Sequence, residues 1–194
     1  MKKFLALMIL FACFVLVSVS AWEPNDLTKY PPSMNENNWL INFGAGFYLP
    51  FATEHGITNN RYIPTIRVSV DKNTPLGDRN LPFFFGGILG YSMHGHTDYF
   101  YLHSIKVGAR FGYHFNWGIE NLDTYAVVVA GWNFNIYDNK LNNTVEFNDL
   151  NLLNDLLAGL NFGARWYVND WFGFWVEAGY TTSSLFDIGL SFKF

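Results

Sequence analysis

Charged side chains occupy the middle of several stretches of this 194-residue sequence in which apolar and polar residues alternate. They are Arg67, Lys106, Arg110, Arg165, Glu177, Asp187 and Lys193. Alternation places all of them on the less apolar face of the predicted strands. Such a set suits three kinds of chemistry: a network of ion pairs that neutralises buried charge, a gate in which the pairs exchange partners, or acid–base catalysis.

Glu177 and Asp187 fall on neighbouring predicted strands and on the same face. We expect Lys106, Arg110 and Arg165 to reach these carboxylates across a narrow interior. Because an unpaired buried charge is costly, a salt-bridged interior is the favoured interpretation. Catalysis is disfavoured, since an interior filled by these side chains leaves no entry for a substrate.

Histidines form a second group of candidates. The residues concerned are His94, His96, Asp98, His103 and His55, all in or near predicted connecting segments. Imidazoles and a carboxylate are zinc or copper ligands, but this spacing matches no specific metal motif. A solvated loop is the simpler interpretation, so we predict no metal site and no cofactor, and we expect His103 to face outward.

Other chemistries lack their sequence signatures. Phosphate-binding, dinucleotide-binding and nucleophile-elbow motifs are absent. Cys13 is the only cysteine, so neither a disulfide framework nor a cysteine-pair metal site is predicted. The net charge of −4 and the absence of a basic run argue against a nucleic-acid partner.

The residues beyond position 38 alternate with a period of two, which is the period of β-strands. The predicted strands are 39–49, 61–70, 82–93, 99–115, 122–134, 156–168, 171–181 and 185–194. The phase of 122–134 is the least certain, because both of its faces are apolar in the middle. Pro64 removes a donor from the second strand, which predicts a bulge or a late start to pairing.

The two faces of these strands differ in chemistry. One carries nearly all the Phe, Trp, Ile and Val residues, and the other carries Gly, Asn, Ser and the mid-strand charges. In a soluble barrel such as a lipocalin the apolar face would point inward. However, the interior of an eight-stranded barrel holds only side chains or one small ligand. We therefore predict an apolar exterior in lipid and a salt-bridged, mostly filled interior in which glycines make room for large side chains. Closing the sheet satisfies every edge hydrogen-bonding group.

Three segments of the chain are expected. Residues 1–21 have two lysines, an apolar run and small residues before Ala21, which is the layout of a cleavable signal peptide. A retained membrane anchor and a lipoprotein signal at Cys13 are the alternatives. Residues 22–38, rich in Pro and Asn, predict an irregular periplasmic arm, and 39–194 the barrel.

An even number of strands places both termini on one side of the membrane. The longest loop, Asn135–Asp155, is then expected on the outer side, where it is our candidate for surface contacts. Aromatic residues near strand ends predict two interfacial belts. The periplasmic belt comprises Trp39, Phe83, Tyr113, Phe115, Trp166, Phe172, Phe192 and Phe194, and the outer belt Phe47, Tyr62, Tyr91, Trp132 and Tyr180.

The closing stretch, Leu185–Phe194, alternates and ends on an aromatic residue. It resembles the last strand of bacterial outer-membrane barrels, and the pattern over residues 39–194 resembles the small eight-stranded members: the OmpA transmembrane domain, OmpX and OmpW. The resemblance implies the bacterial outer membrane, a monomer embedded in its lipid, and recognition of the closing strand by the barrel-assembly machinery.

Three roles remain open at this point. The favoured one is a non-enzymatic barrel that contributes to envelope integrity or binds surface ligands through its outer loops. The second is a small channel or a transporter of hydrophobic solutes, as in OmpW. The third is modification of lipid A, but the family's His-x-Ser pair is not matched, because Ser104 follows His103 directly.

Overall fold

The computed structural model describes residues 28–47, 60–96, 100–139, 144–147, 156–181 and 184–194. The strands among them are β1 (Trp39–Phe47), β2 (Asn60–Asn73), β3 (Phe83–His96), β4 (Phe100–Phe115), β5 (Leu122–Asn139), β6 (Thr144–Phe147), β7 (Leu156–Tyr167), β8 (Phe172–Thr181) and β9 (Phe186–Lys193). Among these described residues, no helix is long and apolar enough to span a membrane.

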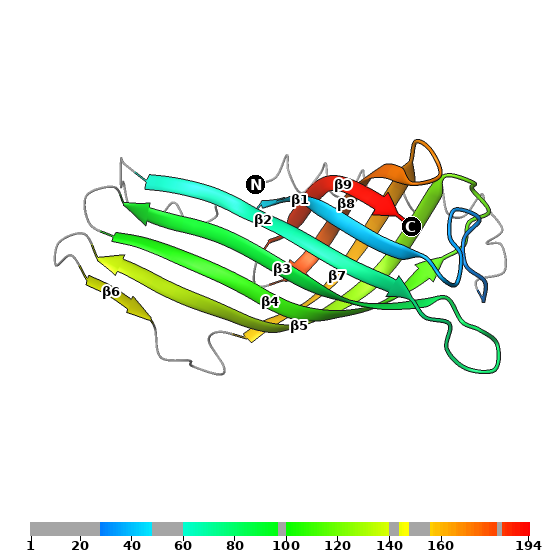
Figure 1. Cartoon of the computed structure of the whole chain (residues 1–194), viewed down its shortest axis with the longest axis horizontal. Helices are drawn as coiled ribbons and strands as arrows, with labels where there is room; N and C mark the ends of the chain where they lie inside the picture. Colours follow the sequence, from blue (N-terminus) through cyan, green and yellow to red (C-terminus); the bar gives the residue numbers. More distant parts are fainter. Residues whose placement is uncertain (1–27, 48–59, 97–99, 140–143, 148–155, 182–183) are drawn as a thin grey trace, which may run out of the picture.

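Eight of the strands form a closed antiparallel barrel (Figure 1). Hydrogen bonding runs in the order β4-β3-β2-β1-β9-β8-β7-β5, and β5 pairs with β4 to complete the circle. Trp39 and Phe194 exchange backbone hydrogen bonds, so the start of β1 and the end of the chain lie together. The prediction of an all-β, eight-stranded up-and-down barrel is confirmed.

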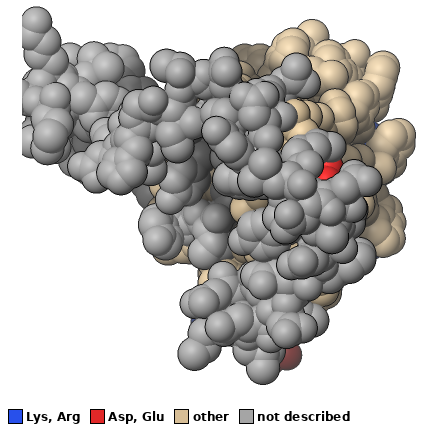
Figure 2. Space-filling view, turned by 90° about the vertical axis from the view of Figure 1, so that its left-hand side faces the viewer, with Lys and Arg blue, Asp and Glu red and all other residues tan. Residues whose placement is uncertain are grey.

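We call the end of the barrel that holds Trp39 and Phe194 the terminal end, and the opposite one the far end. The connections at the terminal end are 74–82, 116–121 and 168–171. At the far end, β2 to β5 continue well beyond β1, β8 and β9, and β6 extends this projecting sheet by pairing with Ile136–Asn139 of β5 (Figure 1). The part of the described surface that is visible from the far end is mostly without charged residues and has small acidic areas (Figure 2).

Several predicted boundaries were wrong. β6 lies inside the segment 135–155, which was predicted to be a loop, and β5 runs to Asn139. His94 and His96 belong to β3 rather than to a loop. β2 runs to Asn73, so the region predicted to be a turn from Asp71 onward begins three residues later. In β2, β3 and β5, backbone hydrogen bonds to the neighbouring strand continue past the last residue of the apolar–polar alternation.

Pro64 lies at an irregularity in β2. The register with β3 shifts between Ile63, which pairs with Met93, and Ile66, which pairs with Tyr91. Two residues of β2 therefore oppose one residue of β3, which is a β-bulge. The predicted bulge is confirmed. It shifts the alternation, so that Ile63 lies on the same face as Ile66 although they are three residues apart.

The two faces of the barrel wall are distinct. Phe162 is 59% exposed on the outside of β7, whereas Arg165 on the same strand is wholly buried inside. On β5, Val127 and Val129 are buried and Val128 is 52% exposed, which settles the phase that the sequence left uncertain. Trp171 shares the parity of Glu177 and so falls on the predicted inner face, but it is instead exposed at the β7–β8 turn.

Aromatic rings surround the terminal end of the exterior. Phe83 stacks on Phe111 and meets Tyr113 edge to face, with ring centroids 5.1 and 4.9 Å apart. On the opposite wall, Phe172 contacts Phe192 at 5.6 Å. The predicted outer-belt residues Tyr62 and Tyr180 have side chains outside the described set.

Glycines on the inner face make room for large side chains, as predicted. A Cβ at Gly112 would lie 2.2 Å from the ring of Phe84, and one at Gly163 would lie 2.2 Å from the ring of Tyr125. Neither ring has space to retreat, because both are fully buried.

We expect Gly112→Ala to lower the free energy of unfolding by about 1–3 kcal/mol, the usual cost of overpacking. Gly87→Ala is the matched control, since its Cβ would meet only one atom, the carbonyl oxygen of Gly108 at 3.7 Å. Both can be measured by denaturant unfolding followed by tryptophan fluorescence. Equal effects of the two substitutions would contradict this account of the interior.

Candidate functional site: the barrel interior

Glu177 on β8 is the centre of the ionic network inside the barrel. Its carboxylate pairs with Arg67 of β2 at 2.8 Å and with Arg110 of β4 at 3.1 Å. It also accepts hydrogen bonds from the hydroxyl of Tyr125 at 3.0 Å and from the amide of Asn161 at 2.7 Å. Four strands therefore meet at one carboxylate that is 1% exposed.

Arg67 connects this centre to Asp187 on β9. The two residues pair at 2.8 Å, and the guanidinium carbon of Arg67 lies 4.7 Å from the centroid of the Trp175 ring. Ser184 donates its hydroxyl to the same carboxylate at 2.9 Å. Glu177 and Asp187 are direct cross-strand partners, so Arg67 neutralises two neighbouring acids.

A second branch runs toward the terminal end. Arg110 pairs with Asp71 of β2 at 3.0 Å, and Asp71 pairs with Arg165 of β7 at 3.2 Å. Arg165 then pairs with Asp123 of β5 at 2.6 Å. All four side chains are completely buried. Because each charge touches an opposite charge, the cost of removing them from water is offset within the network.

His114 on β4 ends this branch. Its Nδ1 lies 2.6 Å from a carboxylate oxygen of Asp123, and its Nε2 lies 3.1 Å from the amide oxygen of Asn73. The ring is fully buried between Phe84, with centroids 4.9 Å apart, and Tyr30, at 5.6 Å.

Lys106 is placed differently from the other buried bases. Its ammonium group donates to the hydroxyls of Ser92, at 2.6 Å, and Thr65, at 3.5 Å. It does not approach Glu177, contrary to expectation. Arg165 also departs from expectation, because it binds Asp71 and Asp123 instead of Glu177 or Asp187.

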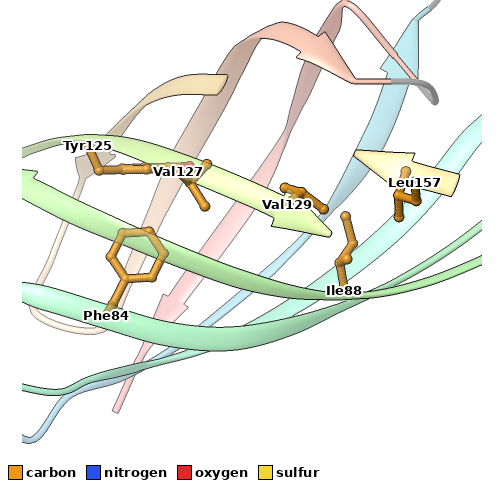
Figure 3. Close-up of a cluster of buried hydrophobic side chains, with 6 residues drawn as sticks. All are labelled: Phe84, Ile88, Tyr125, Val127, Val129 and Leu157. Atoms are coloured by element: carbon orange, nitrogen blue, oxygen red, sulfur yellow. The ribbon is translucent and has the colours of Figure 1, made fainter. Parts of the chain in front are cut away.

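The rest of the interior is apolar. Phe84, Ile88, Tyr125, Val127, Val129 and Leu157 form one buried cluster. In Figure 3, Ile88, Val129 and Leu157 gather at one end of this cluster, and Phe84 and Tyr125 lie at the other. Tyr125 joins the cluster to the ionic network, because the guanidinium of Arg165 lies 4.0 Å from its ring centroid. The interior is thus filled partly by ion pairs and partly by hydrocarbon.

Residues 28–38 close the terminal end. Met34 is 4% exposed and packs with Leu40 and Tyr167. The hydroxyl of Ser33 donates to the carbonyl of Leu122 at 3.0 Å, and that of Tyr30 donates to Phe83 at 2.8 Å. Residues 28–38, which we call the arm from here on, therefore fold into the mouth of the barrel.

Charged and amide side chains of the barrel donate hydrogen bonds to backbone carbonyls of the arm. Lys193 donates to the carbonyl of Ser33 and lies over the ring of Tyr167, so it is at the mouth and not in the central network. Lys72 donates to Asn37 at 2.6 Å, and the amide nitrogen of Asn73 donates to Asn35 at 2.7 Å.

Sequence reasoning missed several members of the network. Asp71 was excluded because the second strand was ended at Val70, although Asp71 continues the inward alternation of Arg67 and Ser69. Asp123 lies near the start of the predicted strand 122–134, where the sequence indicates no role for it. His114 shares the parity of Arg110 and so falls on the predicted inner face, but the sequence indicates no partner for it. Extending the alternation past the last apolar residue would have found the first of these.

The histidines considered as possible metal ligands lie only partly within the described residues. No group of three possible metal ligands occurs among them. His103 faces outward, as expected, and its Nδ1 lies 2.8 Å from the hydroxyl of Tyr91. His55, Asp98 and the side chains of His94 and His96 lie outside the described set.

The chain matches no protein-family model, and no curated protein sequence matches it. Its function has to be argued from the geometry of the barrel.

We expect Arg110→Ala to lower the free energy of unfolding by about 3–5 kcal/mol, because Asp71 and Glu177 each lose one of two arginine partners and the buried network loses one positive charge. Arg79→Ala, in an exposed turn, is the control and should have little effect. Denaturant titration in the same detergent measures both. A loss at Arg110 no larger than that at Arg79 would show that the network contributes little to stability.

Burial, assisted by the negative charge of Glu36, raises the pKa of Tyr30 to about 12. The protonated phenol is therefore favoured in the docked arm. Its stabilising contribution is present below the ordinary tyrosine pKa and is lost as the pH rises from about 10 to about 12. An ultraviolet difference titration against Tyr30→Phe should show one phenol ionising in that upper range. If the phenol that Tyr30→Phe removes instead ionises with the ordinary tyrosine pKa, Tyr30 is exposed to solvent and the docked position of the arm is contradicted.

Proposed function

We propose that this protein is an integral barrel of the bacterial outer membrane. The proposal is supported by the apolar exterior, where Phe162, Trp166 and Val168 are each more than half exposed. Water would make such a surface costly, whereas hydrocarbon favours it. A closed barrel also leaves no sheet edge unpaired in lipid. Phe194, 66% exposed beside β1, is available to the assembly machinery that reads the closing strand of such barrels.

The interior supports a closed, non-enzymatic barrel over a pore. The observation that carries this proposal is the continuous chain of ion pairs from Asp187 to Asp123, which crosses the interior and engages every buried carboxylate among the described residues. Acid–base catalysis requires a group free to exchange a proton with substrate. Each acid here already binds an arginine, and the arm covers the terminal end.

The biological role we propose is mechanical and adhesive. A filled barrel anchors a protein in the membrane and contributes to envelope integrity. The projecting sheet of β2 to β6 at the far end is available to surface ligands. The chain is proposed to act as a monomer, since closure satisfies its backbone without a partner.

Planar-bilayer recording tests the closed interior. The wild-type protein should be electrically silent, because ion pairs fill the passage. Discrete conductance steps in the wild type would favour the channel or transporter instead. If steps do occur, their loss or change in Glu177→Ala or Arg110→Ala would identify the interior as the pathway.

The lipid placement is tested on the exterior. Phe162→Arg should reduce the free energy of folding into lipid vesicles by about 2–4 kcal/mol, the cost of a cation near the bilayer centre. Asp78→Arg, in an exposed terminal-end turn, is the control and should be tolerated. A wild-type chain that stays folded and dissolved without detergent would contradict the proposal.

Mass spectrometry of lipid A tests the non-enzymatic assignment. Lipid A from cells that express the folded protein should carry the same acyl chains as lipid A from cells without it. A change in acylation that depends on the protein would overturn the assignment and favour the third role.

A further inference from the structure

His114 connects the ionic network to the arm through Asn73. The imidazole lies at the terminal end of the network, and Asn73 stands between it and the carbonyl of Asn35 in the arm. A chain of hydrogen bonds thus runs from Asp123 through His114 and Asn73 into the arm.

The orientation of the Asn73 amide is determined by the arm. Its nitrogen donates to the carbonyl of Asn35 at 2.7 Å, and a carbonyl can only accept. The amide oxygen of Asn73 must then be the atom that faces Nε2 of His114, at 3.1 Å. An oxygen in that position accepts, so Nε2 carries a hydrogen.

The other ring nitrogen also faces an acceptor. Nδ1 lies 2.6 Å from a carboxylate oxygen of Asp123, whose second oxygen is held by Arg165 at 2.6 Å. An ionised carboxylate accepts only, so Nδ1 carries a hydrogen as well. A ring with hydrogens on both nitrogens is the imidazolium cation.

We propose that His114 is a proton-controlled latch that holds the arm in the mouth of the barrel. The imidazolium orients Asn73 so that its amide nitrogen fastens Asn35. When the ring loses a proton from Nε2, a lone pair faces the oxygen of Asn73, and the two repel. The amide turns to offer its nitrogen to the ring, and its bond to the arm breaks.

The groups that face His114 come from five elements. Asp123 and Tyr125 lie on β5, Asn73 on β2, Phe84 on β3 and Tyr30 on the arm, while Arg165 of β7 shares Asp123. Asp123 stabilises the cation, and Arg165 competes for Asp123. This inference rests on the proposed closed barrel, since it describes how one end of it is held shut.

Nuclear magnetic resonance tests the protonation state directly. In the folded full-length chain, both ring nitrogens of His114 should resonate as protonated while the arm is docked. The resonances are assigned by their absence in His114→Gln. A neutral ring with one protonated nitrogen in the docked state would overturn the proposal.

Thiol labelling tests the coupling to the arm. A cysteine at Ser33, which is 6% exposed, reports docking in a chain whose native cysteine is replaced, Cys13→Ser. Labelling is measured between about pH 5 and about pH 9, the range in which histidines titrate, and is normalised to the unfolded chain at each pH. The rate should rise by a factor of about 2 to 10 as the ring loses its proton, as expected for loss of the neutral hydrogen bond between Asn73 and Asn35.

Two variants isolate the latch. In His114→Gln the labelling rate should not follow pH, whereas His103→Gln, an outward histidine on the same strand, should behave as the wild type. If His114→Gln does not fold, Asn73→Ser replaces it, because it removes the link between ring and arm. Labelling that is independent of pH in the wild type, or equally dependent on pH in these variants, would overturn the latch. Labelling reports docking of the arm and not ion flow, so its outcome is independent of the planar-bilayer test.

Discussion

The interior of this barrel is too narrow to hydrate its own charges, and most features of the molecule follow from that constraint. Eight strands enclose space for side chains only, so each buried carboxylate must find a base on another strand. Glu177 satisfies this requirement with Arg67 and Arg110. Asp71 and Asp123 satisfy it by sharing Arg165. Long arginine side chains are suited to this, because their forked donors span the barrel.

The arm extends the same logic to the mouth of the barrel. Backbone carbonyls at a strand end need donors, and the arm supplies them through Tyr30 and Ser33. In return, Lys72 and Asn73 supply donors to carbonyls of the arm. Each side therefore satisfies groups that the other leaves unpaired, which is how an irregular segment rich in Pro and Asn becomes ordered.

The fold could be predicted from the sequence because alternation over long strands is a repeated signal. The inward position of Arg67, Arg110 and Glu177 followed from parity alone. The pairing could not be predicted, because parity states which face a residue is on and not how far along the barrel it lies. Strand stagger decides that Arg165 meets Asp123, and stagger is set by the register of all eight strands. Docking of the arm was also beyond prediction, since it depends on single hydrogen bonds rather than on a pattern.

Arg67 and Asp187 are separated by 120 positions in the chain, yet they touch at the centre of the barrel. Asp187 is on the last strand, so it cannot pair with Arg67 until that strand has joined the first. An incomplete barrel would expose bare charges to hydrocarbon, so intermediates with some strands inserted are penalised. Assembly is therefore cooperative. Its free-energy barrier includes the entropy cost of bringing together two parts of the chain that are far apart in the sequence.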